Sequence, residues 1–451
     1  MSSSDPSDNK SPRVLIVGAG LGGLMLGIIL ERAGIDYCIF ERAAKVKPLG
    51  SAMSLGPNIL PVFEQLGLME ELDKISVPLI GADIYNVEMQ NTGYEKVIFA
   101  RPRLYELMLK QVPEHKVFMN KRVLRMQEKD DQVFIHCSDN TSYNGDILVG
   151  ADGAYSAVRQ NMYKELKEKG ILPNSDTDEL TIGFIGMVGV AEPKDPSKYP
   201  QLQHPSAQMS TIIGENRLFW GVNNCPDNQL CWALYYQFKS VEESKSEQFR
   251  NSEWGPEANE AMIKQFYDHP CPYGGKMGDL IDDTPKDLIS KVFIEDKMFD
   301  TWFHSRVVLL GDACHKMLPG SGQGAVNAMQ DAVILANCLY DLVDASSKSI
   351  TTVFQDYYDQ RYPLAKHMLE NSRIMSKAQV GQSWWERALR YAFFNLIPDW
   401  VQQHTLAKNA EYRPQIAFLP LIENRGTGHV LPQKASRRHP EEQALQAIVA
   451  V

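Results

Sequence analysis

Residues 14–41 contain the pattern that most constrains how this chain folds. Four consecutive apolar residues, Val14–Val17, are too few for a helix and are typical of a strand buried on both faces. A glycine-rich turn follows directly and leads into an apolar stretch that ends at Gly34. Gly18 allows a tight turn, Gly20 lets a ligand approach the backbone, and Gly23 lets the next helix pack closely on the strand. The sequence therefore predicts a strand, a turn and a helix at the start of an α/β domain.

The second half of this unit indicates what the turn binds. Residues 36–40 form the next predicted strand, and Glu41 follows it. At about this spacing a carboxylate accepts hydrogen bonds from the two ribose hydroxyls of an adenosine. The N-terminus of the helix offers free N–H groups and a positive dipole end to a diphosphate. A glycine-rich turn in an ordinary α/β protein is the alternative, but it leaves the position of Glu41 unexplained.

Composition excludes several classes of protein. The 451 residues include 46 basic and 56 acidic ones, a net charge of −10, and no basic run is long enough to bind nucleic acid. The seven cysteines are scattered without a CxxC pair, which argues against a zinc site or a disulfide framework and fits a reducing compartment. Residues 1–12 lack the apolar core of a signal peptide, and no run of about eighteen apolar residues occurs. We expect a cytoplasmic protein with a disordered N-terminal tail over residues 1–12, no transmembrane helix, no metal site and no nucleic-acid partner.

Two further stretches suggest contact with a ligand. A loop of small residues, which includes Ala52, precedes a helix whose apolar face contains Ile59, Val62, Phe63 and Leu66. Such a loop suits a flat ligand, although a simple connector also explains it. Arg101 and Arg103 open another helix, where the helix dipole disfavours positive charge. They indicate a nearby anion, with simple solvation as the alternative.

The rest of the chain changes pattern three times. Residues 181–300 are strand-like and rich in aromatic residues, which predicts a separate sheet-based lobe. A buried strand then ends at Gly311-Asp312, and a loop of small residues leads to another helix. This loop contains a GxGxxA pattern, but the pattern does not directly follow a strand, so we do not interpret it as a second dinucleotide-binding fingerprint. Residues 384–397 show helical spacing of apolar residues, for which core packing is the better interpretation and peripheral contact with a membrane surface the alternative. Residues 425–451 are mostly polar and are expected to form a loosely held tail.

Three motifs stand in one order along the chain: GAGLGG with Glu41-Arg42, then Gly150-Ala151-Asp152-Gly153 with Ser156 and Arg159, then Gly311-Asp312 with His315, Pro319 and Gly322-Gln323-Gly324. Over residues 13–370 the chain closely resembles the single-component FAD-dependent monooxygenases of the para-hydroxybenzoate hydroxylase type, which include salicylate hydroxylase and fungal secondary-metabolite epoxidases. The resemblance implies an α/β fold with a Rossmann-type FAD-binding domain (13–80, 101–180 and 290–370), an inserted antiparallel-sheet substrate lobe (81–100 and 181–289) and a helical C-terminal part (371–424).

The resemblance also implies roles for individual residues. It assigns to the cofactor Gly18, Gly20, Gly23, Glu41, Arg42, Ala52, Arg101, Asp152, Asp312, Gly324 and Ala325. Of these, Glu41 holds the adenosine ribose, and Asp312 binds the ribityl or diphosphate portion. Asp152 lies near both the diphosphate and the passing NADPH. Arg101 contacts the flavin nucleotide, and the N–H groups of residues 324 and 325 face the flavin ring.

Electrostatics agrees with the last of these roles. Reduced flavin carries negative charge on its pyrimidine edge, and a helix that begins at residues 322–325 points its positive end at that charge. An alternative interpretation is that Asp312 has a structural role and caps the N-terminus of a helix. Cys314 and His315 have no partner cluster in the sequence, so packing or support is a better interpretation than a catalytic pair.

The predicted activity is that of an NAD(P)H-dependent, FAD-containing monooxygenase. As the resemblance implies, NAD(P)H reduces FAD, O2 adds to the reduced flavin, and a C4a-hydroperoxide passes one oxygen atom to an organic substrate. The aromatic, arginine-poor lobe favours a nonpolar aromatic or prenylated small molecule, which is hydroxylated or epoxidised. Tyr235 and Trp220 are weak candidates for catalytic side chains. A flavin-dependent reductase or oxidase on the same fold, and a flavin-binding protein without activity, are the alternatives.

Overall fold

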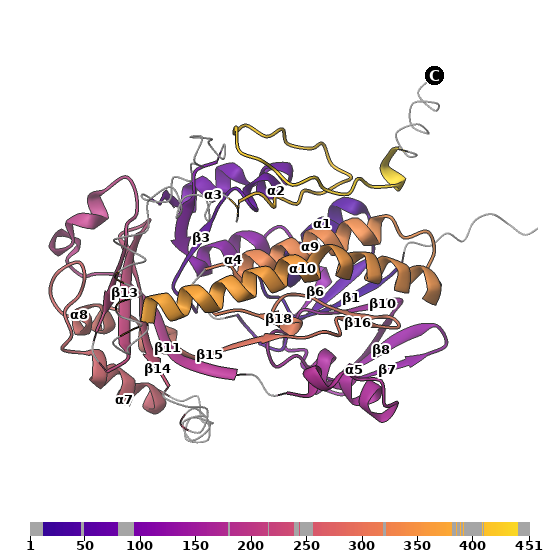
Figure 1. Cartoon of the computed structure of the whole chain (residues 1–451), viewed down its shortest axis with the longest axis horizontal. Coiled ribbons are helices and arrows are strands. Elements are labelled where there is room, and N and C mark those ends of the chain that lie inside the picture. Colours follow the sequence, from indigo (N-terminus) through magenta and orange to yellow (C-terminus); the bar gives the residue numbers. More distant parts are fainter. Residues whose placement is uncertain are drawn as a thin grey trace, which may run out of the picture.

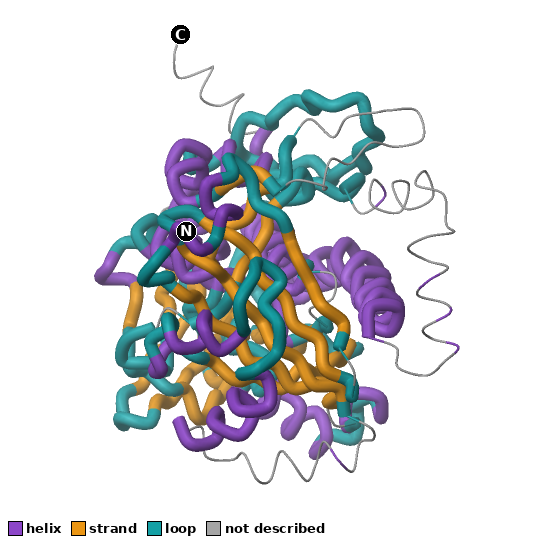
Figure 2. Tube along the Cα trace, turned by 90° about the vertical axis from the view of Figure 1, so that its left-hand side faces the viewer, coloured by secondary structure: helices purple, strands orange, loops and turns teal. Residues whose placement is uncertain are grey.

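The structure is a computed structural model of the chain, in which two six-stranded sheets dominate. It describes residues 12–46, 49–79, 94–178, 181–214, 216–238, 256–318, 322–380 and 410–440, and the single residues 243, 385, 388, 391 and 408. One large sheet is mostly parallel and the other is antiparallel. Figure 1 shows the two sheets side by side with helices packed around them, and Figure 2 shows the strands in the middle of the molecule. The predicted α/β fold with an inserted antiparallel sheet is confirmed.

The parallel sheet is built around the predicted first strand. Its strands are β1 (Val14–Val17), β2 (Tyr37–Phe40), β6 (Val117–Phe118), β10 (Ile147–Gly150), β16 (Phe303–His304) and β17 (Val307–Leu309). They lie in the order β16-β17-β10-β1-β2-β6, and only β16 and β17 pair in antiparallel fashion. Every residue of β1 and β2 is buried, as expected for strands whose two faces are both covered.

Five helices accompany this sheet: α1 (Leu21–Ala33), α4 (Arg101–Leu109), α5 (Ala157–Glu168), α9 (Gly324–Tyr340) and α10 (Ser347–Val380). Gly22 permits α1 to lie close to α9, because a Cβ atom there would be 2.7 Å from Leu310 Cδ1 and 3.2 Å from Ala328 Cβ. α1 ends at Gly34, which has a φ of 67° and donates its N–H to Glu31 O. The predicted end of the first helix is therefore confirmed.

Two three-stranded sheets flank the parallel sheet. One has the order β3-β5-β4 and consists of β3 (Ala52–Leu55), β4 (Val77–Pro78) and β5 (Val97–Ala100); the other is a meander of β7 (Val123–Lys129), β8 (Gln132–Cys137) and β9 (Ser142–Gly145). α2 (Leu60–Gln65) and α3 (Met69–Ile75) follow β3, and the predicted apolar face of the first of these is buried. Short 3-10 helices are η1 (Glu114–Lys116), η2 (Asn174–Thr177), η3 (Pro196–Lys198), η4 (Pro200–Gln203), η5 (Lys286–Leu288) and η6 (Gly311–Ala313).

The antiparallel sheet forms the predicted second lobe. In spatial order its strands are β12 (Met209–Ile213), β13 (Leu218–Cys225), β14 (Gln229–Gln237), β11 (Thr181–Ala191), β15 (Ser290–Met298) and β18 (His315–Lys316). α7 (Pro256–Phe266) and α8 (Met277–Asp282) cover what we call its outer face. β15 lies within the strand-like residues 181–300, and its residues 290–296 pair with β11, whereas the domain bounds implied by the resemblance place it in the FAD-binding domain.

The C-terminal residues 410–440 run over α2 and α9 as an irregular segment, yellow in Figure 1. Ile416 N–H donates to Gln65 Oε1 at 2.8 Å, and the ring of Phe418 stacks on Tyr340 with centroids 4.3 Å apart. Further along, Asp341 accepts hydrogen bonds from backbone N–H groups of residues 437 and 438. Within the predicted tail of residues 425–451, the contacts with Asp341 thus hold residues 437 and 438 against the end of α9. Residues 441–451 lie outside the described part of the chain.

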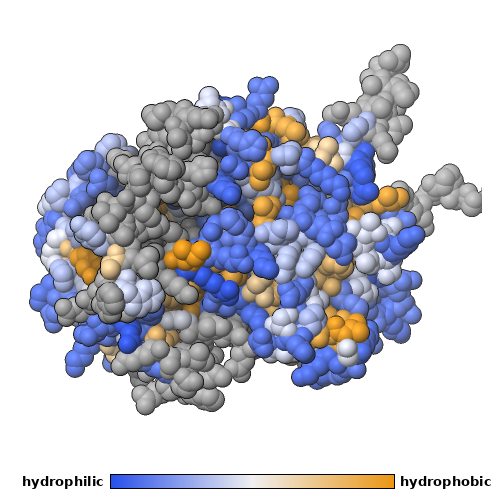
Figure 3. Space-filling model, viewed as in Figure 1, coloured by the Kyte–Doolittle hydropathy of each residue, from blue (hydrophilic) through white to orange (hydrophobic). Residues whose placement is uncertain are grey.

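No helix among the described residues is long and apolar enough to cross a membrane. On the face shown in Figure 3, the described surface is mostly hydrophilic, and hydrophobic residues form small separate spots. The predicted helix of residues 384–397 lies outside the described residues, apart from positions 385, 388 and 391. Its contact with a membrane surface stays a prediction.

Replacement of Phe418 by Ala tests how firmly the C-terminal segment is held. We expect the free energy of unfolding to fall by roughly 3 kcal/mol, because a buried and stacked ring is lost and a cavity remains. Leu421→Ala is the control, since Leu421 is 57% exposed and its loss should change stability by less than about 0.5 kcal/mol. Urea unfolding followed by circular dichroism measures both; equal effects would contradict the anchoring role.

Candidate functional site

The glycine turn before α1 has the geometry that its sequence predicts. Gly18 has a φ of 109°, and a Cβ atom there would lie 2.4 Å from Ala151 O. A Cβ atom on Gly23 would lie 2.1 Å from Gly18 O, so this position also requires glycine. Gly20 differs, because no heavy atom comes within 4 Å of its Cβ position. The space that Gly20 leaves is open, as a bound group would require.

The N-terminus of α1 has no side-chain cap. Gly20 occupies the cap position, no acidic residue lies in the first turn, and hydrogen bonding within the helix begins with Leu24 N–H to Gly20 O. The preceding N–H groups are thus available to an anion at the open side of Gly20.

Glu41 ties the glycine turn to the end of β2. Its two carboxylate oxygens accept the N–H groups of Ala19 at 3.0 Å and Ala43 at 2.9 Å, and each oxygen keeps a lone pair for another donor. Arg42 beside it is exposed. Burial and the nearby charge of Glu41 raise the pKa of Tyr105 to about 12, and the buried Tyr105 hydroxyl has no hydrogen-bond partner among the described residues. Tyr105 is a neutral donor beside Glu41 that the sequence analysis missed.

The start of α9 resembles that of α1. Gln323 is its cap residue without a side-chain hydrogen bond to the helix, and no atom lies within 4 Å of a Cβ on Gly324. The predicted start of this helix is therefore confirmed, and the N–H groups of residues 324 and 325 belong to its uncapped first turn. Asn58 Nδ2 donates to Gln323 Oε1 at 2.9 Å, which brings the loop after β3 to the same place.

Arg101 and Asp312 lie close enough to interact. Desolvation lowers the pKa of Arg101, and the negative charge of the Asp312 carboxylate acts in the opposite direction. The Arg101 side chain is still accessible to solvent. Ala52 pairs with Ala100, so β3 brings Ala52 beside the residue before Arg101. Asp312 is 3.5 Å from Lys316 Nζ. It caps neither η6 nor α9, whose cap residues are Leu310 and Gln323, so the structural alternative for Asp312 finds no support.

The second and third sequence motifs are joined by Arg159. This buried guanidinium donates to Ala313 O at 2.8 Å and to Ala154 O at 2.5 Å. Asp152 Oδ2 accepts the N–H groups of Ala157 and Val158 at the start of α5, whereas its buried Oδ1 has no partner among the described residues. Burial raises the pKa of Asp152. The carboxyl group thus supports α5 and keeps one acceptor for another donor.

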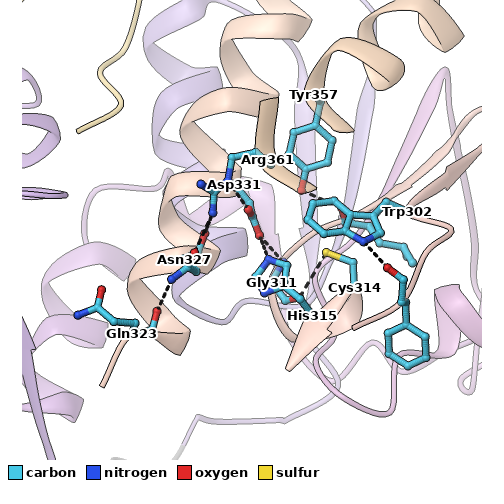
Figure 4. A network of polar contacts seen from close by, with 11 residues as sticks. Trp302, Gly311, Cys314, His315, Gln323, Asn327, Asp331, Tyr357 and Arg361 are labelled. Carbon is cyan, nitrogen blue, oxygen red and sulfur yellow. Dashed lines mark hydrogen bonds and ion pairs between the residues drawn. The ribbon is translucent and has the colours of Figure 1, made fainter. Parts of the chain in front are cut away.

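A buried network around Asp331 holds the third motif in place (Figure 4). Asp331 accepts Gly311 N–H at 2.9 Å, His315 Nε2 at 2.6 Å and Arg361 Nε at 2.7 Å. Arg361 also donates to Asn327 Oδ1 at 3.0 Å. Burial raises the pKa of Asp331, but the charges of His315 and Arg361 outweigh it and lower the value to about 2. The ionised carboxylate therefore links η6, α9 and α10 at any physiological pH.

Cys314, His315 and Asp331 are also close enough to be considered as metal ligands, within 4.8 Å of one another. However, the guanidinium of Arg361 already pairs with Asp331, and both side chains are fully buried. Burial raises the pKa of Cys314 well above its usual range, so the thiol stays protonated and donates to Gly311 O. This cluster is better explained as support for the motif, as the sequence suggested, than as a catalytic pair or a metal centre.

The structure separates the two catalytic candidates. Trp220 points to the outer face of the antiparallel sheet, where its indole N–H donates to Pro270 O at 2.9 Å and its ring stacks on His269. Tyr235 lies on the opposite face, which we call the inner face, stacked on Phe219 with centroids 4.4 Å apart. Burial raises the pKa of Tyr235 to about 12. Among the described residues, no group forms a hydrogen bond with its hydroxyl.

Comparison with known proteins identifies the family. A family model described as FAD binding domain matches residues 12–372. The chain belongs to this family. FAD-dependent monooxygenase paxM of Penicillium paxilli is 29% identical over 82% of this chain and 79% of its own length, and FAD-dependent monooxygenase atmM of Aspergillus flavus is 26% identical over 98% and 94%. The protein is an FAD-dependent oxidoreductase of the monooxygenase family.

Solved structures show the same fold. Klebsiella pneumoniae HpxO, complexed with FAD and uric acid, superposes with a TM-score of 0.67 at 20% identity, and the match covers 89% of this chain and 97% of HpxO. A salicylate hydroxylase substrate complex superposes with a TM-score of 0.60 at 19% identity, over 88% and 98%. The site residues fit FAD: two uncapped helix N-termini and two open glycine positions suit the diphosphate and the flavin ring, and Glu41 suits a ribose.

Gly20→Val tests the assignment of the diphosphate. No protein atom lies within 4 Å of the new Cβ position, so we expect the thermal midpoint of the apoprotein to stay nearly unchanged, whereas FAD binding should be lost because the space is filled. Gly23→Ala is the matched control, since its Cβ clashes with Gly18 O and should lower the apoprotein midpoint. Flavin fluorescence titration measures binding; stoichiometric FAD in Gly20→Val would show that the diphosphate lies elsewhere.

Asp312 is tested with two substitutions. If its carboxylate accepts hydrogen bonds from sugar-like hydroxyls of FAD, Asp312→Ala should weaken the binding free energy of FAD by roughly 1.5–3 kcal/mol, which is about one to two decades in the dissociation constant. Asp312→Asn keeps the shape and one acceptor and should lose less. FAD dissociation constants and apoprotein midpoints distinguish this from a structural role. Unchanged FAD affinity with a lowered apoprotein midpoint would refute the cofactor role.

Proposed function

We propose that this protein uses NAD(P)H and O2 to hydroxylate or epoxidise a nonpolar aromatic or prenylated small molecule. Bound FAD would supply the redox chemistry, in which NAD(P)H is the reductant, one oxygen atom of O2 enters the substrate and the other leaves as water. The protein's own part is to hold the flavin ring, to orient the substrate and to exclude water. A reductase or oxidase on the same fold remains the rival function.

The inner face of the antiparallel sheet is the observation that carries this proposal. Phe184, Ile294 and Leu318 form an apolar cluster against which Phe219 and Tyr235 pack. Leu318 is the last described residue before the stretch that leads to α9, so this cluster adjoins the third motif. The same face reaches β3 and β5 through a second cluster that contains Ala52, Ala100, Val190, Cys225 and Cys231. One side of the sheet thus contacts both flanks of the FAD site.

The chemistry of the inner face suits a nonpolar ligand. Phe184 meets Phe219 edge-on, and Phe219 stacks on Tyr235. Small residues adjoin these rings: Gly186 pairs with Tyr235, and the next pair along this face is Gly221 with Ala233. No inner-face position of β11, β13 or β14 in the described residues is an arginine or lysine that would bind a carboxylate. The Tyr235 hydroxyl, protonated and without a partner there, is the donor that would orient a polar end of the substrate.

Isotope labelling with 18O2 tests the proposal. A panel of prenylated and unsubstituted aromatic compounds, with hydroxybenzoates as polar counterparts, is incubated with the FAD-loaded protein and NADPH or NADH. We expect a nonpolar compound to accelerate NAD(P)H oxidation and to gain one 18O atom, detected by mass spectrometry. Oxidation of NAD(P)H with stoichiometric hydrogen peroxide and no labelled product from any compound would favour an oxidase, and transfer of hydride to the substrate a reductase.

A further inference from the structure

Lys96 lies directly before β5, at the edge of the three-stranded sheet. Leu55 pairs with Val97, so Gly56 and Lys96 face each other just beyond this last pair. Lys96 Cγ is 3.8 Å from the position of a Cβ atom on Gly56, and Lys96 O accepts Leu79 N–H at 2.8 Å. The backbone is therefore fixed, and the absence of a side chain at Gly56 leaves room for the lysine stem.

The charge of Lys96 has no counterpart in the described part of the protein. Its ammonium group makes no ion pair or side-chain hydrogen bond with any described residue, although the side chain is only partly exposed. Desolvation lowers the pKa of Lys96, and no carboxylate among these residues opposes this. Lys116 and Lys121, by contrast, each contact a carboxylate. Desolvating an unpaired cation costs free energy, so a partner that arrives with a ligand would offset this cost.

The neighbours of Lys96 indicate which ligand this is. Asn58 Oδ1 is 3.6 Å from the same Cβ position on Gly56. The amide of Asn58 bonds to Gln323, the cap residue of α9, and Gln330 of the same helix donates to Asn58 O at 3.0 Å. Only the side chain of Asn58 therefore separates Lys96 from the uncapped N-terminus of α9, which is assigned to the flavin ring. The end of a helix dipole and an ammonium group both bring positive charge to this end of the site.

We propose that Lys96 lies against the flavin ring of bound FAD and stabilises the negative charge that the ring gains on reduction. The positive charge increases the affinity of the protein for reduced flavin relative to its affinity for oxidised flavin. This raises the reduction potential and favours anionic adducts of the ring. The inference depends on FAD binding and not on the identity of the organic substrate.

The test compares Lys96→Met and Lys96→Gln with Lys96→Arg, all as FAD-loaded proteins. Without the charge, we expect the preference for reduced over oxidised flavin to fall about tenfold, which is about 30 mV for a two-electron couple. The affinity of the oxidised protein for sulfite, which forms an anionic flavin adduct, should fall by a similar factor. Lys96→Arg should stay within about threefold of the wild type. Lys129→Met is the control, since Lys129 is 65% exposed on β7.

Dye-equilibration potentiometry and sulfite titration give both results without turnover. Two neutral variants are used so that poor folding of one leaves the other to decide. An unchanged potential and unchanged sulfite affinity in a neutral variant with full FAD content would overturn the proposal. A raised KM for NAD(P)H with an unchanged potential would also overturn it, because the lysine would then serve the nicotinamide nucleotide. Inability of the wild-type protein itself to bind FAD would be a failure of the proposed function instead.

Discussion

The flavin site depends on the buried ion pair between Asp331 and Arg361. Taking two charges out of water costs several kcal/mol for each, and a well-packed apolar pair often stabilises a fold equally well. The gain here is geometric. Asp331 accepts three directed hydrogen bonds, and one of them comes from the backbone N–H of Gly311 in η6. Because these bonds have fixed directions, they set the position of Asp312 relative to the start of α9. Arg159 fixes the same turn from the opposite side through Ala313 O.

The second constraint is the lack of caps at the two helix ends that are assigned to the cofactor. By contrast, α5 begins with Ser156 Oγ accepting Arg159 N–H at 2.9 Å, and Asp152 supports the same turn. At α1 and α9 the cap residues are Gly20 and Gln323, and neither makes such a bond. Free N–H groups and open glycine positions cost stability in the absence of ligand. Binding of FAD to the folded chain recovers this free energy, so cofactor affinity and stability are linked.

Local sequence patterns predicted those parts of the site that depend on neighbours along the chain. The strand before Gly18, the close packing at Gly23 and the start of α9 all follow from short motifs. The contact of Arg159 with Ala313 spans 154 residues, and that of Lys96 with Gly56 depends on which strands pair, so neither is encoded locally. Trp220 and Tyr235 could not be distinguished, because apolar residues occupy both faces of their sheet and the usual alternation is absent.

The two faces of the antiparallel sheet differ in what they contact, so one sheet could stabilise the lobe on one side and bind the proposed substrate on the other. The outer face buries the large side chains Trp220, Trp232 and Leu234 beneath α7 and α8, and its indole N–H groups have partners. The inner face combines aromatic rings with glycines and leaves the Tyr235 hydroxyl without a hydrogen-bond partner among the described residues. Under the proposed function, a substrate that covers the rings and accepts a hydrogen bond from Tyr235 would bind more tightly than a smaller or more polar molecule. The FAD residues are constrained by backbone geometry that tolerates little change. If the inner face binds the substrate as proposed, changes to its side chains would alter substrate choice without disturbing the turns assigned to FAD.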